Sequence, residues 1–292
     1  MKKILLNTLL LSTFLIANEN FSRYGHFQKQ NQSQRISVAP LASPQILLGD
    51  FGIGFDYYHY KEPNVMDIFG PMFNVFGDFS VIKKLFRFQI DASYSTHMDA
   101  NHYDGSLQSD TGKIPYETKS TDWYANIATK AGFSLYENRE ILFIYIGLGY
   151  RFLWNDIIDK DGIKASYHRY QGYLYLPIGI SGEISISPTL SLISLLEYRV
   201  LLFGHNTSTF SELGYDRDLF FKQYTGNGAR ISIGLRYYFS PNYSVKFNFY
   251  YDYWSIQDST LENAYLNGVY KGTFVEPKNH TNVFGINIAF SF

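Results

Sequence analysis

The chain has 292 residues, of which 18% are aromatic and only 17% charged, and its formal net charge is −1 at pH 7. A soluble globular domain carries about 25% charged residues, so aromatic side chains here occupy surface that charges would otherwise cover. The near-neutral charge gives no electrostatic basis for binding nucleic acid. The absence of cysteine excludes disulfides, thiolate metal sites and a cysteine nucleophile.

The N-terminus has the organisation of a secretory signal peptide. A positively charged start, Met1–Lys3, precedes an apolar stretch over residues 4–16, and Ala17 is a small residue at the expected cleavage point. The polar segment that follows is rich in Gln and Asn and contains two prolines, which predicts a flexible periplasmic lead-in. We therefore expect three parts: a signal peptide (1–17), a flexible segment (18–45) and one folded domain (46–292).

From residue 46 onward the chain repeats runs of about 10–14 residues in which apolar and polar side chains alternate, as in β-strands. The last run is the clearest, because Phe284, Ile286 and Ile288 share one face while Asn287 and Ser291 lie on the other. About ten tilted residues span a bilayer, so each run has the length of a transmembrane strand. Ten such runs are present, at about 47–60, 69–79, 85–97, 122–135, 141–154, 173–186, 190–203, 230–239, 244–254 and 284–292.

The connections between these runs alternate between short and long. The short ones include Ser187-Pro188 and Ser240-Pro241-Asn242, while the long ones lie at about 61–68, 98–121, 155–168, 205–225 and 255–281. Short periplasmic turns and long external loops are typical of outer-membrane barrels. The sequence therefore predicts an all-β fold: a ten-stranded antiparallel transmembrane β-barrel, arranged as an up-and-down meander, with its N- and C-termini in the periplasm.

Aromatic residues fall at both ends of the predicted strands, where amphipathic rings are expected to lie at the two membrane interfaces. The expected membrane girdle contains Trp123, Trp154 and Tyr253 at the external rim and Phe239, Tyr243 and Phe292 at the periplasmic rim.

The last strand, which ends at Phe292, resembles the C-terminal signature of Gram-negative outer-membrane β-barrel proteins. This resemblance implies a location in the bacterial outer membrane and recognition of Phe292 by the barrel-assembly machinery. In strand number the chain is similar to the omptin proteases and to small adhesin barrels. Outer-membrane lipid and lipopolysaccharide are the partners that such a barrel implies, with a host or surface ligand at the external loops.

Strand parity turns equal numbers of acidic and basic side chains toward the barrel axis. A small barrel leaves an interior about one side chain wide, in which charges must be paired. We therefore expect a filled, ion-paired lumen. The expected charge network comprises Asp50, Asp56, Asp78, Arg87, Asp91, Lys130, Arg151, Glu183, Glu197, Arg199, Arg230, Arg236, Lys246 and Asp252, with Asp122 and Arg169 also inward.

The similarity to omptins implies one set of candidate catalytic residues near the external mouth: His97, Asp99 and Asp122 on one side and His205 on the other. That family activates a water between two acidic residues and an Asp/His pair. Here Ser120 replaces the first acid of the acidic-x-acidic-Trp run, and Phe203 stands two residues before His205, where an acidic partner would be needed. We therefore expect no enzymatic activity, and neither a metal nor another cofactor.

The sequence thus predicts a non-enzymatic outer-membrane barrel with a charge-paired lumen and long external loops for surface interaction. Two alternatives stay open at this point. The first is a narrow, porin-like channel for small solutes or ions, because the predicted lumen is lined by charges. The second is an omptin-like surface protease.

Overall fold

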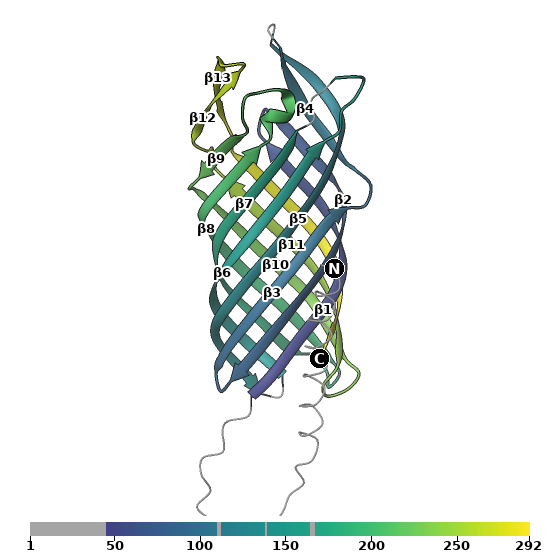
Figure 1. The fold of residues 1–292 in the computed structure, drawn as a ribbon. Helices are drawn as coiled ribbons and strands as arrows, with labels where there is room; N and C mark the ends of the chain where they lie inside the picture. Colours follow the sequence, from purple (N-terminus) through teal and green to yellow (C-terminus); the bar gives the residue numbers. More distant parts are fainter. Residues whose placement is uncertain (1–44, 110–111, 138, 164–166) are drawn as a thin grey trace, which may run out of the picture. The chain divides into compact units, whose positions relative to one another are not determined.

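The computed structural model describes residues 45–109, 112–137, 139–163 and 167–292 (Figure 1). The expected signal peptide, 1–17, lies outside the described residues. So does the expected flexible segment, 18–45, apart from Gln45, which begins the first strand. Among the described residues, no helix is long and apolar enough to cross a bilayer.

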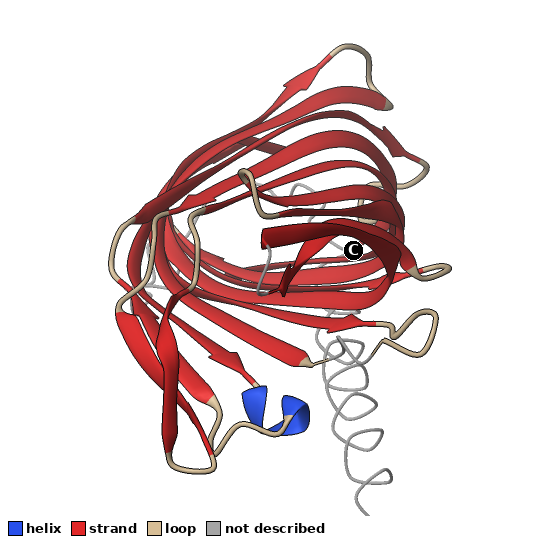
Figure 2. Cartoon of the chain, turned by 90° about the horizontal axis from the view of Figure 1, so that it is seen from above, coloured by secondary structure: helices blue, strands red, loops and turns tan. Residues whose placement is uncertain are grey.

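Ten long antiparallel strands form a closed barrel, as the alternating pattern predicts (Figures 1 and 2). Each strand pairs with the next along the wall, and β1 pairs with both β14 and β2, which closes the sheet. The meander is interrupted only by short strands outside the ring. The wall strands are β1 (Gln45–Glu62), β2 (Met66–Lys83), β3 (Phe86–His97), β5 (Gly112–Glu137), β6 (Arg139–Ile157), β7 (His168–Ser185), β8 (Leu190–Ser208), β10 (Gly226–Tyr238), β11 (Ser244–Ile256) and β14 (Asn279–Ser291).

The wall is apolar outside and polar or tightly packed inside. On β14, Phe284, Ile286 and Ile288 are 41–59% exposed, whereas Asn287 and Ala289, which point to the axis, are buried. Exposed rows of this kind recur on other wall strands, for example at Phe51, Ile146 and Ile231. Apolar surface on this scale is favourable only if it faces lipid, because water would penalise it at about 25 cal/mol per Å².

The external connections are more ordered than the sequence indicates. The predicted long loop at 61–68 is wrong, because β1 and β2 continue outward to a three-residue turn in which Asn64 has a φ of 64°. The other external segments contain further elements. These are β4 (Asn101–Ser109), which pairs with β5 and β2, the 3₁₀ helix η1 (Phe210–Leu213), β9 (Leu219–Gln223) on β8, and the hairpin β12 (Leu261–Leu266) and β13 (Val269–Val275).

Candidate functional site

The lumen divides into an external half and a periplasmic half of different chemistry. The external half is filled by an apolar and aromatic core, in which Tyr60, Ile68, Met72, Leu153 and Ile256 are almost completely buried. The sequence pattern does not predict this core, because the strands continue beyond the membrane and their inward positions become apolar there.

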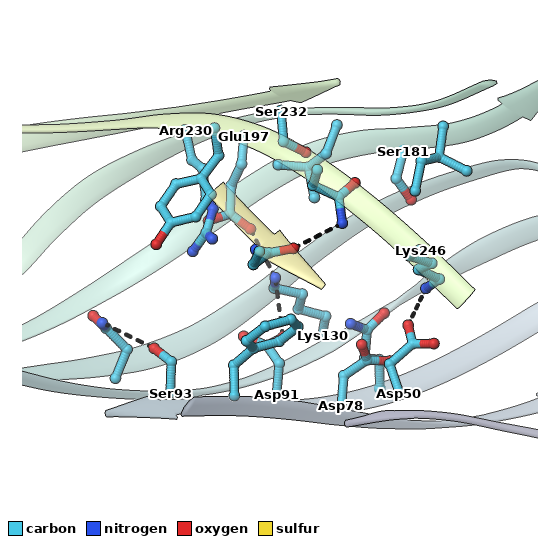
Figure 3. Close-up of a pocket in the computed structure, with 18 of the residues that line it drawn as sticks. Asp50, Asp78, Asp91, Ser93, Lys130, Ser181, Glu197, Arg230, Ser232 and Lys246 are labelled. Atoms are coloured by element: carbon cyan, nitrogen blue, oxygen red, sulfur yellow. Dashed lines mark hydrogen bonds and ion pairs between the residues drawn. The ribbon is translucent and has the colours of Figure 1, made fainter. Parts of the chain in front are cut away.

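The periplasmic half is polar and contains a cavity of about 230 Å³. Figure 3 shows Lys130 extending between Asp91 and Glu197, with its ammonium 3.0 Å and 2.9 Å from their carboxylates. Lys246 likewise forms an ion pair with Asp50 from two strands away (Figure 3). The Lys130–Glu197 and Lys246–Asp50 pairs connect strands that share no backbone hydrogen bonds, whereas the Lys130–Asp91 pair joins the neighbouring strands β5 and β3.

Ten of the fourteen expected network side chains form ion pairs with one another. Arg199 Nη1 lies 2.9 Å from both carboxylate oxygens of Asp252, and its Nε forms a second ion pair of 2.7 Å with Glu197. Hydrogen bonds between charged groups of this kind are stronger than those between neutral groups. The ten are Asp50, Asp91, Lys130, Glu183, Glu197, Arg199, Arg230, Arg236, Lys246 and Asp252.

The four remaining network residues have other surroundings. Arg87 pairs with Glu140, which the sequence analysis assigns to no site. Asp78 lines the cavity and lies in register between Asp50 and Asp91. The Asp56 carboxylate accepts hydrogen bonds from hydroxyl groups, which satisfy it without a cation; these belong to Tyr124, Tyr250 and Ser95.

Arg151, the fourth of these residues, has no ion pair with any described residue. Its guanidinium carbon lies 5.2 Å from the ring centroid of Tyr124 and 5.3 Å from that of Trp254, an arrangement that gives cation–π attraction. Its Nε and Nη1 are buried without a hydrogen-bond partner. Trp254 belongs to β11, four strands around the ring from β6, so this contact crosses the lumen.

The external mouth is spanned by a second cross-lumen contact, which we call the external clasp: Tyr60, Glu62, Arg169, Gln171 and Glu276. The Arg169 guanidinium pairs with both glutamates. The Gln171 amide donates to the Glu276 carboxylate and to the Tyr60 hydroxyl, both at 3.0 Å. Arg169 is on β7, five strands from β1 in either direction, so its pair with Glu62 spans the barrel.

Glu276 precedes β14, outside the membrane-spanning strands. Its burial raises its pKa to about 8, and the nearby Glu62 carboxylate raises it further while Arg169 opposes the shift. Glu62 and Glu276 are not among the predicted site residues, because both lie in segments predicted to be loops. The parity of β1 could have found Glu62, whereas Glu276 has no signal in the strand pattern.

Above the mouth, η1, β9 and the β12–β13 hairpin form an external cap with its own small core (Figure 1). Leu219, Phe221 and Ala264 are buried there. The Asp216 carboxylate accepts hydrogen bonds of 2.6 Å and 2.8 Å from the backbone N–H groups of the Asn267-Gly268 turn. The long external segments therefore form a structured platform.

The omptin-like candidates do not converge on one opening. Asp122 is buried and accepts hydrogen bonds from Ser120, Asn101 and Asn155, while Asp99 is exposed and pairs with Lys119. His97 contacts the backbone of Asp122, through Nδ1 at 2.9 Å from its carbonyl oxygen.

His205 faces outward, so the expectation that it lies opposite His97, Asp99 and Asp122 across the mouth is wrong. A register shift at Leu174/Tyr175 reverses the parity of β8 beyond Leu201. As a result, the His205 ring lies on the outer wall, 2.9 Å from the Tyr150 hydroxyl and beside Phe203. The His205 ring and the buried Asp122 carboxylate therefore lie on opposite faces of the wall.

The six expected girdle residues all lie on the outer wall or at its edge. At the external rim, Trp123 and Trp154 stack with centroids 6.2 Å apart, and Tyr253 stacks on His280. At the other end, Phe239 stacks on Tyr243 at 6.3 Å, and the Phe292 backbone closes the wall by hydrogen bonds to Gly49. Among the described residues, no group of three or more His, Asp or Glu side chains could hold a metal ion.

Comparison with known proteins finds similarity at the level of structure. No protein-family model and no curated protein sequence matches the chain. The barrel is similar to the outer membrane protease OmpT from Escherichia coli, with a TM-score of 0.55 and 10% sequence identity over 84% of this chain and 96% of that chain. Neisserial surface protein A also matches, with a TM-score of 0.37 and 7% identity over 85% and 98% of the two chains. At such identity, the likeness to OmpT shows the fold alone.

The closed meander, the apolar outer wall and the likeness of the fold to OmpT together define an outer-membrane β-barrel protein. The expected fold class is confirmed, as is the ten-stranded architecture shared with omptins. The barrel lies in the bacterial outer membrane in contact with its lipid, with both ends of the wall on the periplasmic side.

Proposed function

We propose that the protein is a non-enzymatic outer-membrane scaffold whose lumen is closed and whose external cap is the functional surface. The observation that carries this proposal is the external clasp, because an ion pair between diametrically opposed strands leaves no axial path. The Arg151–Trp254 contact blocks the lumen a second time below it. Buried charges are stable in this setting because most of them are paired.

Planar-bilayer recording tests the closed lumen. We expect the reconstituted wild-type protein to give no conductance steps above background. A triple variant, Arg151→Ser, Trp254→Ser and Arg169→Ser, removes both cross-lumen contacts and should give steps, which shows that the assay detects an open lumen. Wild-type steps as large as those of the triple variant would instead support the narrow channel, which the polar periplasmic cavity favours.

The omptin-like alternative has a separate test. We expect no cleavage of dibasic peptides by the refolded protein, because His205 lies on the outer wall and Asp122 is held by three donors. Cleavage that is lost in His205→Ala but retained in the outward-facing control His280→Ala would contradict the non-enzymatic proposal.

The external cap supplies the proposed surface for a host or surface ligand. The β12–β13 hairpin exposes Leu261, Tyr265, Val269 and Tyr270, and tyrosine is enriched at binding hot spots. The outward aromatic girdle supports contact with lipopolysaccharide, and the terminal Phe292 supports recognition by the barrel-assembly machinery.

Shortening the hairpin tests this surface. Replacement of residues 261–275 by a short Gly-Ser linker should leave heat-modifiable folding intact, since no wall strand is touched. We expect adhesion of cells that display the protein to fall to the level of cells without it. Adhesion equal to that of the wild type would show that the hairpin is not the binding surface.

A further inference from the structure

The external clasp holds one more acidic group than its cation can neutralise. Glu62 and Glu276 share the single guanidinium of Arg169, and all three side chains are at most 5% exposed. A buried charge without a partner is costly, so the closed arrangement favours one neutral carboxyl group. The two carboxyl groups therefore bind one proton more in the closed clasp than they would in water at neutral pH.

Glu276 couples this proton to the external cap. Its backbone N–H donates to the Ser259 hydroxyl at 2.8 Å, and its carbonyl accepts from the Ser259 N–H at 3.0 Å. These bonds close the base of the segment that carries β12 and β13. If the Glu276 carboxyl group moves out of the mouth, the base of the β12–β13 segment, which is bonded to Glu276, is released with it.

We propose that the external clasp is a pH-responsive latch, which holds the base of the β12–β13 segment at the mouth in acid and releases it as the solution becomes alkaline. Release leaves Arg151 and Trp254 in place below, so the latch can open while the lumen remains closed. The latch is thus independent of the closed-lumen proposal, and either can fail alone.

The direction follows from proton linkage. The pKa of Glu276 is about 8 in the closed clasp and about 4.5 when the group is solvated. A group whose pKa is raised on closing stabilises the closed state fully below the lower value, and that stabilisation is lost as the pH rises toward the higher one. Within this pH window, the equilibrium constant for closing the clasp falls by about tenfold for each pH unit.

Apart from Glu62, which shares the guanidinium and the extra proton, the titratable groups that face Glu276 do not change charge in this range. They are Arg169, which stays protonated, and tyrosine hydroxyls, whose ordinary pKa is about 10. Burial raises the pKa of Tyr167, just before β7, even further. The tyrosines are Tyr60 of β1, Tyr173 of β7 and Tyr167.

Hydrogen exchange of residues 257–278 in lipid vesicles tests the latch. After correction for intrinsic exchange rates, we expect wild-type protection to fall by at least about tenfold from pH 5 to pH 8. Glu276→Gln and Glu62→Gln each leave one carboxylate for one guanidinium, so protection should change by less than about twofold in both.

Glu262→Gln is the matched control, because Glu262 lies on the same hairpin but pairs with Arg217 at its surface. This variant should keep the wild-type pH dependence. The latch is contradicted if Glu276→Gln and Glu62→Gln lose protection with pH as steeply as the wild type, or if the wild type shows no loss. If Glu276→Gln misfolds, Glu62→Gln decides the outcome, since it tests the same shared guanidinium.

Discussion

Replacing Arg169 by methionine is expected to lower the free energy of unfolding at pH 7 by about 3–5 kcal/mol, because removing one partner leaves buried charge uncompensated. Methionine preserves much of the side-chain volume, so the loss reports charge rather than a cavity. Both glutamates of the external clasp lose the one cation that the described residues supply to them, and the hydroxyl and amide groups that remain cannot neutralise them. Urea unfolding in lipid vesicles measures the difference.

Arg151→Met is the matched control, since it removes an equally buried arginine that has no ion pair with a described residue. Replacing such a charge by an apolar side chain is often neutral or stabilising. We expect a change below about 1 kcal/mol, or a small gain. Equal destabilisation by the two substitutions would show that volume, and not charge pairing, sets the stability of the filled lumen.

The second large effect concerns the outer wall. Ile233→Arg, in the middle of β10, should destabilise the barrel by about 2–4 kcal/mol, because the new charge lies at the bilayer midplane. Tyr237→Arg, on the same face but near the periplasmic end of that strand, should cost only about 0–1 kcal/mol.

The comparison is controlled because Ile233 and Tyr237 are equally exposed, at 54% each. On a sheet in water the two arginines would have similar, small effects. We would measure both variants by urea unfolding in vesicles of one lipid composition. Equal costs at the two positions would contradict a lipid-facing wall.

The ten wall strands could be predicted from the sequence because lipid and lumen impose opposite polarities on alternate residues. This rule is local and holds wherever the strand register is regular, as on β14, where Phe284, Ile286 and Ile288 all face outward. It fails where the register shifts. The irregularity at Leu174/Tyr175 turns His205 outward, and no residue type in that stretch predicts such a shift.

The remaining differences lie outside the membrane, where the polarity rule no longer applies. The strands continue outward, so segments such as 61–68 and 98–121 contain paired strands although their composition resembles that of loops. Glu62 and Glu276 are brought together by closure of the barrel, which places residues more than 200 positions apart at one mouth. Glu140 pairs with Arg87 from two strands away, and this ion pair could not be predicted from the sequence for the same reason.

The most direct test of the account is the orientation of side chains along β14 in lipid. The chain has no native cysteine, so single cysteines at positions 283–290 can each carry a fluorophore without background labelling. With a quencher attached to lipid chains, positions 284, 286, 288 and 290 should be quenched strongly and positions 283, 285, 287 and 289 weakly. Uniform quenching, or stronger quenching at the odd-numbered positions, would contradict a barrel whose apolar face contacts the membrane and whose charged side chains point to the axis.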